Sequence, residues 1–234
     1  MRSYSEYIHV RMCVFADFMD GLSFRVIVGR SDSLDKGSDE IRCSLNGLGE
    51  NTSWEQRKLG EVVTFAKGSG YSKSDLTETG TPIILYGRLY TKYETIIRDI
   101  DTFSDAKEDS VFSQGGEVIV PASGETAEDI SVASVVEKPG VLLGGDLNII
   151  HPGKEVDAIF LAISVSNGEP HSDMARRAQG KSVVHLHNED LSQIKLCYPS
   201  IREQSKISSF FSEMDDLITL HQRWWKWLHL MWCR

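Results

Sequence analysis

The chain has 234 residues, a length that suits one large domain, or one domain with an appendage, better than two full domains. Hydrophobic residues make up 41% of it and charged residues 25%, with a mean hydropathy of −0.24, as in water-soluble globular proteins. The formal net charge of −9 excludes a polycation that coats nucleic acid over its whole surface, but it permits a local basic face. Because neither a membrane span nor the apolar core of a signal peptide is present, we expect a cytoplasmic protein without membrane contact.

Residues 1–53 differ in character from the rest of the chain. They hold one apolar run, residues 24–28, followed by a polar stretch that contains several glycines and serines and has little to bury. We therefore expect an atypical and weakly ordered N-terminal segment that ends near residue 53.

From residue 54 to residue 199, short apolar stretches alternate with glycine, proline, aspartate and serine. Their length and β-branched content are typical of strands. The expected strands are residues 61–66, 82–85, 117–120, 130–136 and 183–186. Residues 156–165 have the length and the alanine and leucine content of a short buried helix, although a strand is also possible there. Together these patterns predict a single domain of the α/β or α+β class.

The hydrophobic period changes from two to about three and a half after Pro199. Ser200 followed by Glu203 forms a capping box, so a long helix is expected from near Ile201 to Trp232. Such a helix is about 48 Å long, which is more than the domain needs for itself. Its heptad seam predicts a coiled-coil-type contact with a partner helix, while the alternative is that the helix covers its own core. The seam consists of Ile207, Phe211, Met214, Ile218, His221, Trp225 and Leu228.

Charge is distributed unevenly along the chain. Residues 99–129 carry nine carboxylates and one lysine, a net charge of −8, and we interpret them as a solvated rim. Residues 65–76, 86–93 and 175–182 carry basic side chains among Tyr, Ser, Gly or Gln. Arginine can bind guanine, serine and tyrosine can bind bases or phosphates, and glycine lets the backbone approach closely. These three loops are therefore candidates for a DNA-binding face, with an ordinary solvated surface as the alternative.

The sequence does not predict a catalytic or cofactor site. Residues 175–182 end in Gly-Lys-Ser, as phosphate-binding loops do, but we expect neither the strand before them nor the helix after them that nucleotide binding requires. His185 and His187 would point to the same side of a strand, yet further metal ligands at a suitable spacing are missing. The four cysteines lack Cys-x-x-Cys spacing and are expected to be free thiols. We expect a protein that is not an enzyme and holds no metal or cofactor.

Three stretches of the sequence resemble the specificity subunit of type I restriction and modification enzymes. They are WEQRKLGEVVTFAKGSGYS at residues 54–72, GTPIILYGRLY at 80–90, and GKSVVHLHNEDLSQIKLCYPSIREQSKISSFFSEMDDLITLHQR at 180–223. The motif P-S-x-x-E-Q-x-K-I at residues 199–207 is the most distinctive part. The resemblance implies one target recognition domain, residues 54–199, followed by one spacer helix, residues 200–234. That arrangement corresponds to half of a complete subunit.

The resemblance also implies partners and contact residues. Family members recognise one half of a split DNA sequence with each recognition domain, and their helices pack together and dock the modification subunits. The implied partners are double-stranded DNA, the modification and restriction subunits, and a second half-subunit or second copy bound through the C-terminal helix. The implied DNA contacts are Lys67, Ser69, Tyr71, Lys73, Arg88, Tyr90, Lys92, Arg176, Arg177, Gln179 and Lys181. A helix-driven assembly protein without DNA binding is the alternative, and the acidic net charge favours it.

Overall fold

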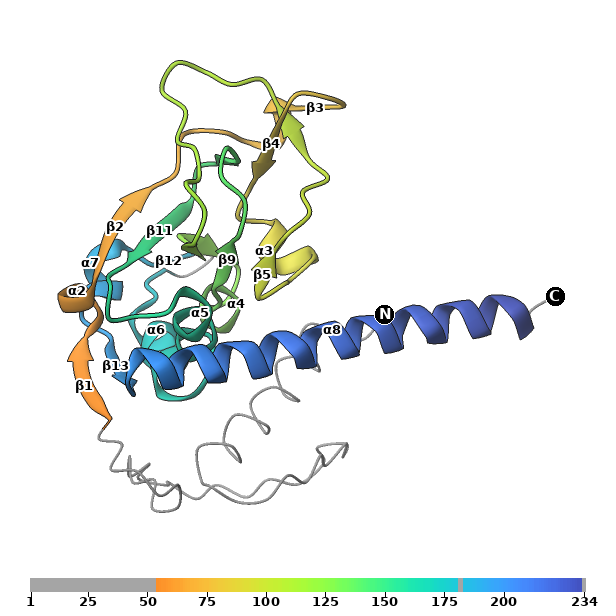
Figure 1. The fold of residues 1–234 in the computed structure, drawn as a ribbon. Coiled ribbons are helices and arrows are strands. Elements are labelled where there is room, and N and C mark those ends of the chain that lie inside the picture. The colour runs from red at the N-terminus through yellow and green to blue at the C-terminus, as the bar shows by residue number, and fades with distance from the viewer. Residues whose placement is uncertain (1–53, 181–182, 233–234) are drawn as a thin grey trace.

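A five-stranded sheet with the order β2-β11-β7-β9-β5 forms the centre of the fold (Figure 1). The computed structural model describes residues 54–180 and 183–232. Neighbouring strands are antiparallel except β5, which runs parallel to β9. The strands are β2 (Val63–Lys67), β5 (Ile96–Ile97), β7 (Glu117–Pro121), β9 (Ser134–Val136) and β11 (Leu147–Pro152). Because adjacent strands are far apart in the sequence, the sheet brings distant loops to common edges.

Three smaller β structures surround this sheet. A four-stranded sheet has the order β10-β4-β6-β3 and lies at the top of Figure 1. Its strands are β3 (Leu76–Thr77), β4 (Thr81–Ile84), β6 (Phe103–Ser104) and β10 (Leu142–Leu143). The other two are antiparallel ribbons, one of β1 (Glu55–Lys58) with β13 (Lys195–Tyr198) and one of β8 (Ser123–Gly124) with β12 (Val184–His185).

The helices pack around the central sheet and lead out of it. Helix α5, the helix predicted at residues 156–165, is buried over most of its length and contacts β7, β9, α6 and α8. The helices are α2 (Leu59–Val62), α3 (Arg88–Thr91), α4 (Ala127–Ile130), α5 (Ala158–Val165), α6 (Gly168–Arg177), α7 (Asn188–Ser192) and α8 (Ile201–Trp232), with a 3₁₀ turn η1 (Lys73–Asp75). Within the described ranges, none of these helices combines the length and apolar character that a bilayer span requires.

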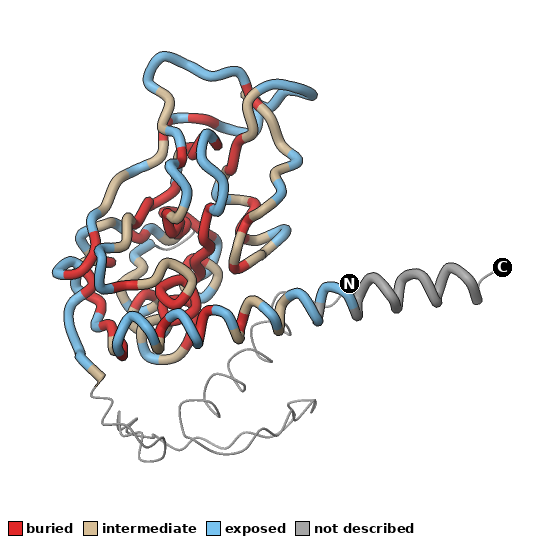
Figure 2. Tube along the Cα trace, viewed as in Figure 1, coloured by how far each residue is buried: buried red, intermediate tan, exposed pale blue. Residues whose placement is uncertain are grey.

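Apolar side chains cover both faces of the central sheet. On β7, Val118 and Val120 belong to the larger core beneath α5, whereas Ile119 belongs to a second core with Leu89 and Leu147. Every residue of β7 is buried, which explains the apolar run that follows Glu117, whose carboxylate accepts the backbone N–H groups of Gln114 and Gly115. The buried segments in Figure 2 are concentrated in this sheet and in α5. The sheet is therefore a rigid scaffold for the loops at its edges.

Three of the expected strands are only partly strands, and of residues 183–186 only Val184 and His185 form one. Residues 61 and 62 belong to α2, because Leu59 and Val62 both enter the larger core, which one helical turn allows. Residues 130–133 likewise precede β9, since the short helix α4 ends at Ile130. The strand β11 at the centre of the sheet, Leu147–Pro152, was not among the expected strands.

Helix α8 begins at Ile201, as the capping box predicted, and extends beyond the domain (Figure 1). Ser200 and Glu203 are bonded to each other at this end, since Ser200 Oγ donates to Glu203 Oε2 at 2.9 Å and the Ser200 carbonyl accepts the Glu203 N–H at 2.9 Å, in place of the reciprocal side-chain-to-backbone bonds of a capping box. Ile207 and Phe211 are 4% and 2% exposed and belong to the larger core of the same chain. This corrects their assignment to a seam that faces a partner helix.

Farther along α8 the apolar side chains are exposed. Leu217 and Leu220 are 62% and 51% exposed, while Met214 is half-buried. Arg98, in the loop after β5, donates a hydrogen bond to Asp216 at 3.2 Å and so links the domain to this part of the helix. The remaining predicted seam positions have side chains outside the described set, namely Ile218, His221, Trp225 and Leu228. The predicted N-terminal segment, residues 1–53, also lies outside the described residues.

Candidate nucleic-acid interface

The β8–β12 ribbon joins the second and third candidate loops. His185 of β12 lies opposite Ser123 of β8, and Tyr90 Oη donates a hydrogen bond to the Ser123 carbonyl at 2.7 Å. Gln179 and His185 exchange two backbone hydrogen bonds of 2.9 and 2.7 Å. Tyr90 and Gln179, which are 89 positions apart, are thus attached to one ribbon.

The first candidate loop reaches the same region through two asparagine side chains. Asn188 Nδ2 donates to the Ala66 carbonyl at 3.1 Å, and buried Asn148 donates to the Leu186 carbonyl at 2.8 Å. Lys67, at the end of β2, lies opposite Asn148 in the sheet. The segment that follows β12 is therefore tied to β2, and the structure brings the start of the first loop, at Ala66 and Lys67, close to the other two loops.

Gly180 forms the tight turn that leads into the ribbon. Its φ of +148° is a conformation that side-chain-bearing residues rarely adopt, and a Cβ there would lie 1.8 Å from the Val183 carbonyl oxygen. Helix α6 precedes this turn and strand β12 follows it, which is the reverse of the strand–loop–helix order of a phosphate-binding loop. Lys181 and Ser182 lie outside the described residues.

In the second loop, Arg88 is a buried structural cation. Its guanidinium donates to Glu94 at 2.7 Å, to Asp101 at 2.8 Å and to the Asp99 carbonyl at 2.6 Å. Lys92 binds the same Asp101 at 3.2 Å, and its hydrogen bond is the main cause that lowers the Asp101 pKa, with Arg88 adding to it. Carboxylates of the acidic stretch thus hold this loop in place. The Arg88 guanidinium is buried and ion-paired, so it is not accessible to DNA.

Ser69 and Tyr71, in the first loop, are also buried and bonded within the fold. The Ser69 hydroxyl accepts the Val111 backbone N–H at 3.1 Å. The Tyr71 hydroxyl is 2.5 Å from the Ser110 hydroxyl and accepts the Lys107 backbone N–H at 2.9 Å. These two predicted DNA contacts therefore shape the loop.

Four predicted basic contacts remain accessible. Lys67 and Lys73 are exposed and form no ion pair within the described part of the chain. Arg176 and Arg177 share one carboxylate, Asp173, at 3.3 and 3.1 Å, so this group retains one net positive charge. The accessible cations thus lie in the first and third loops.

Tyr90, unlike the accessible cations, has its functional group bonded within the fold. Burial raises the pKa of its hydroxyl above the ordinary tyrosine value, and the carboxylates of Asp129 and Asp146 raise it further. The hydroxyl therefore stays protonated and donates to the Ser123 carbonyl. Its ring packs edge-on against exposed Tyr86, with 6.0 Å between centroids.

The ribbon also presents two histidines that the DNA prediction did not include. His185 and His187 are both exposed, with nearly parallel rings 6.4 Å apart at 6°. The described residues contain no group of three His, Cys, Asp or Glu side chains arranged to hold a metal. The sequence signal that could have identified them is the spacing of His185 and His187, which alternate across one residue shortly after the basic loop that contains Gln179.

Buried Gln204 fixes the start of α8 to the domain. Its Oε1 accepts the Asp157 backbone N–H at 2.8 Å, and its Nε2 donates to the carbonyls of Glu155 and Pro199 at 2.8 and 2.9 Å. The Asp157 carboxylate in turn caps the N-terminus of α5 and accepts the Ser208 hydroxyl of α8. The distinctive motif at residues 199–207 thus builds a polar joint between the domain and the helix.

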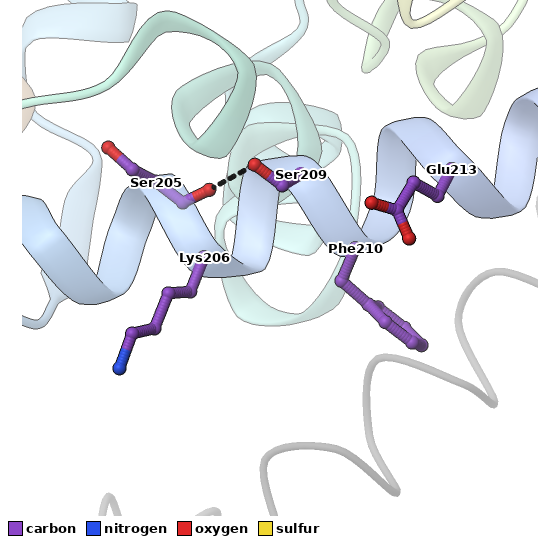
Figure 3. Close-up of a pocket in the computed structure, with 5 residues that line it drawn as sticks. All are labelled: Ser205, Lys206, Ser209, Phe210 and Glu213. Atoms are coloured by element: carbon purple, nitrogen blue, oxygen red, sulfur yellow. Dashed lines mark hydrogen bonds between the residues drawn. The ribbon is translucent and has the colours of Figure 1, made fainter.

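The opposite side of α8 carries a hollow near the same end of the helix (Figure 3). It is lined by Ser205, Lys206, Ser209, Phe210 and Glu213. Lys206 and Glu213 are exposed, and Phe210 is half-buried with its ring edge-on to Phe211 at 5.5 Å. Among the described residues, the five that line the hollow all belong to α8, and none belongs to the three loops.

The comparisons with known proteins support one family. Residues 51–224 match the type I restriction modification DNA specificity domain. No curated protein is significantly similar in sequence.

Three solved structures have a similar fold. The S subunit of a type I restriction-modification system from M. genitalium is 16% identical, with a TM-score of 0.53 over 73% of this chain and 41% of that one. The HsdS subunit from Thermoanaerobacter tengcongensis is 14% identical, with a TM-score of 0.52 over 76% of this chain and 41% of that one. A third structure comes from a study of complex assembly and conformational transition of the type I R-M system. It is 13% identical, with a TM-score of 0.58 over 94% of this chain and 46% of that one. The chain thus spans less than half the length of each.

Proposed function

Because the chain belongs to the family of type I restriction modification DNA specificity domains, we propose that it is a non-catalytic DNA-recognition element of such an enzyme. It contacts one half of a bipartite target, and methyl transfer and cleavage are carried out by the modification and restriction subunits. The observation that carries this proposal is that the second and third loops meet at the β8–β12 ribbon and that the segment after the ribbon is bonded to β2, where the first loop starts.

The accessible cations supply affinity that does not depend on sequence. Lys67, Lys73, Arg176 and Arg177 bind phosphates, release counterions and position the domain on the duplex. Their sparse number on a chain of net charge −9 predicts weak and salt-sensitive binding for one half-site. The bonds of Ser69 and Tyr71 fix the conformation of the first loop, and the ion pairs of Arg88 fix that of the second.

Helix α8 is the element that joins this domain to its partners. The modification subunit binds the outward face of α8, where the hollow lined by residues 205–213 lies. A second half-subunit, or a second copy, packs on the exposed apolar positions farther along, beginning at Leu217 and Leu220. The restriction subunit joins the assembled complex.

Salt-dependent DNA binding by the chain co-purified with a modification subunit tests this function. We expect the logarithm of the binding constant to fall linearly with the logarithm of salt concentration, and Lys67→Ala to reduce that slope by about one. Lys154→Ala is the matched control, because Lys154 is exposed beyond the opposite end of β11. Retention on DNA that does not fall as salt is raised would overturn the proposal and favour an assembly protein without DNA binding.

A further inference from the structure

We propose that the β8–β12 ribbon is the base-contacting element, with Gln179, His185 and His187 as the residues that determine sequence preference. The inference rests on the proposed function and assigns the direct contacts to side chains other than the accessible cations. Both residues of β8 are buried, so the outward side of the ribbon consists of β12 and the adjoining residue Gln179. Side chains on that side can meet the edge of the major groove of B-DNA, where each base pair presents a distinct pattern of donors and acceptors.

The ribbon presents these three side chains outward from a fixed backbone. Gln179 and His185 are paired through two backbone hydrogen bonds, and both side chains are exposed. His187 lies two residues farther on and its ring is nearly parallel to that of His185. His187 lies beyond β12 as the N-cap of α7, where its backbone N–H donates to Asp190 Oδ2 at 3.2 Å, and the nearly parallel rings place the two imidazoles side by side.

The supports under the ribbon make it a rigid platform. The Ser123 carbonyl is bonded to Tyr90, and the Leu186 carbonyl is bonded to buried Asn148. The Leu186 N–H donates to the Ala122 carbonyl at 3.0 Å. With the backbone held by these contacts, the exposed side chains keep a defined direction, as recognition of a base edge requires.

The chemistry of the three side chains suits bases better than phosphates. The glutamine amide can pair with adenine N6 and N7, and an imidazole N–H can donate to guanine N7 or O6. Gln179 carries no charge, so it adds no net electrostatic attraction to a phosphate.

Selection of bound duplexes from a random pool tests the assignment, with the chain in complex with a modification subunit. We expect Gln179→Ala, His185→Ala and His187→Ala each to lose between about fivefold and about a hundredfold of the preference at one or two base pairs. Their salt slopes should equal that of the wild-type chain. Arg177→Ala is the contrasting variant, expected to weaken binding to all sequences and to lower the slope while the selected motif stays the same.

The possible outcomes separate the two proposals. An unchanged motif in all three ribbon variants, with the wild-type chain still selecting a motif, overturns this inference and leaves the proposed function standing. A wild-type complex that selects no motif and shows no salt dependence overturns both. Thermal unfolding of each variant, and the milder His185→Asn, distinguish lost recognition from lost folding, since an exposed side chain should change stability by less than about 0.5 kcal/mol.

Discussion

Replacing Gln204 by alanine should destabilise the protein strongly, although the residue is neither apolar nor close to the loops. The substitution removes a fully buried side chain and leaves three backbone groups without partners, the N–H of Asp157 and the carbonyls of Glu155 and Pro199. A buried polar group without a partner costs about 1–3 kcal/mol. Because Glu155 is exposed, water can reach part of this joint, and we expect a total loss of about 3–5 kcal/mol.

Urea unfolding followed by circular dichroism measures this loss in the full chain. Ser205→Ala is the matched control, because Ser205 is the next residue of α8, is exposed and bonds only to the carbonyl one turn earlier. We expect it to change the free energy of unfolding by less than about 0.5 kcal/mol. If Gln204→Ala costs no more than Ser205→Ala, the joint does not fix the helix and the reasoning is wrong.

Two further predictions concern charged side chains. Arg88→Met should cost about 2–3 kcal/mol in urea unfolding, because it leaves carboxylates such as Asp101 without their buried partner; a changed base preference in the folded variant would contradict a structural role. The carboxyl of Asp75, bonded by Lys107 and by the backbone and hydroxyl of Ser72, should titrate with a pKa of about 2 by NMR. Since the ordinary value is about 3.9, its contribution to stability is full above that pH and is lost as pH falls through about 2. Lys107→Met should raise the measured pKa, and an unchanged midpoint would rule out the pairing.

The C-terminal helix could be predicted from the sequence because its signals are local. A capping box at Ser200 and a period of about three and a half specify where a helix begins and which side is apolar, and α8 begins at Ile201. The same pattern could not tell what covers the apolar side. Ile207 and Phe211 pack on the core of their own chain, and only α5, more than 40 residues earlier, determines that contact.

From the sequence, the candidate DNA-binding site could be predicted only as a set of three loops. The basic and aromatic loop composition indicated the three segments, and the sheet brings them together. Which side chains stay accessible depends on partners that are distant in the sequence. Arg88 is bound by carboxylates six and thirteen residues away, and Tyr71 is bonded to Ser110, so neither burial follows from the loop itself. His185 and His187 lacked the local positive charge that marked the other candidates.

The joint at Gln204 has a consequence for distance measurement along DNA. From Phe211, the last residue of α8 buried in the domain, to Trp232 the helix rises about 32 Å. A tilt of about 10° at the joint would move the far end by about 5–6 Å, more than the 3.4 Å spacing of successive base pairs. If α8 spaces two recognition domains as proposed, its accuracy depends on the contacts that fix it to the domain, namely the Gln204 amide, Ser208, the packed Ile207 and Phe211, and the Arg98–Asp216 pair. A looser joint would then change the separation of two sites by at least one base pair.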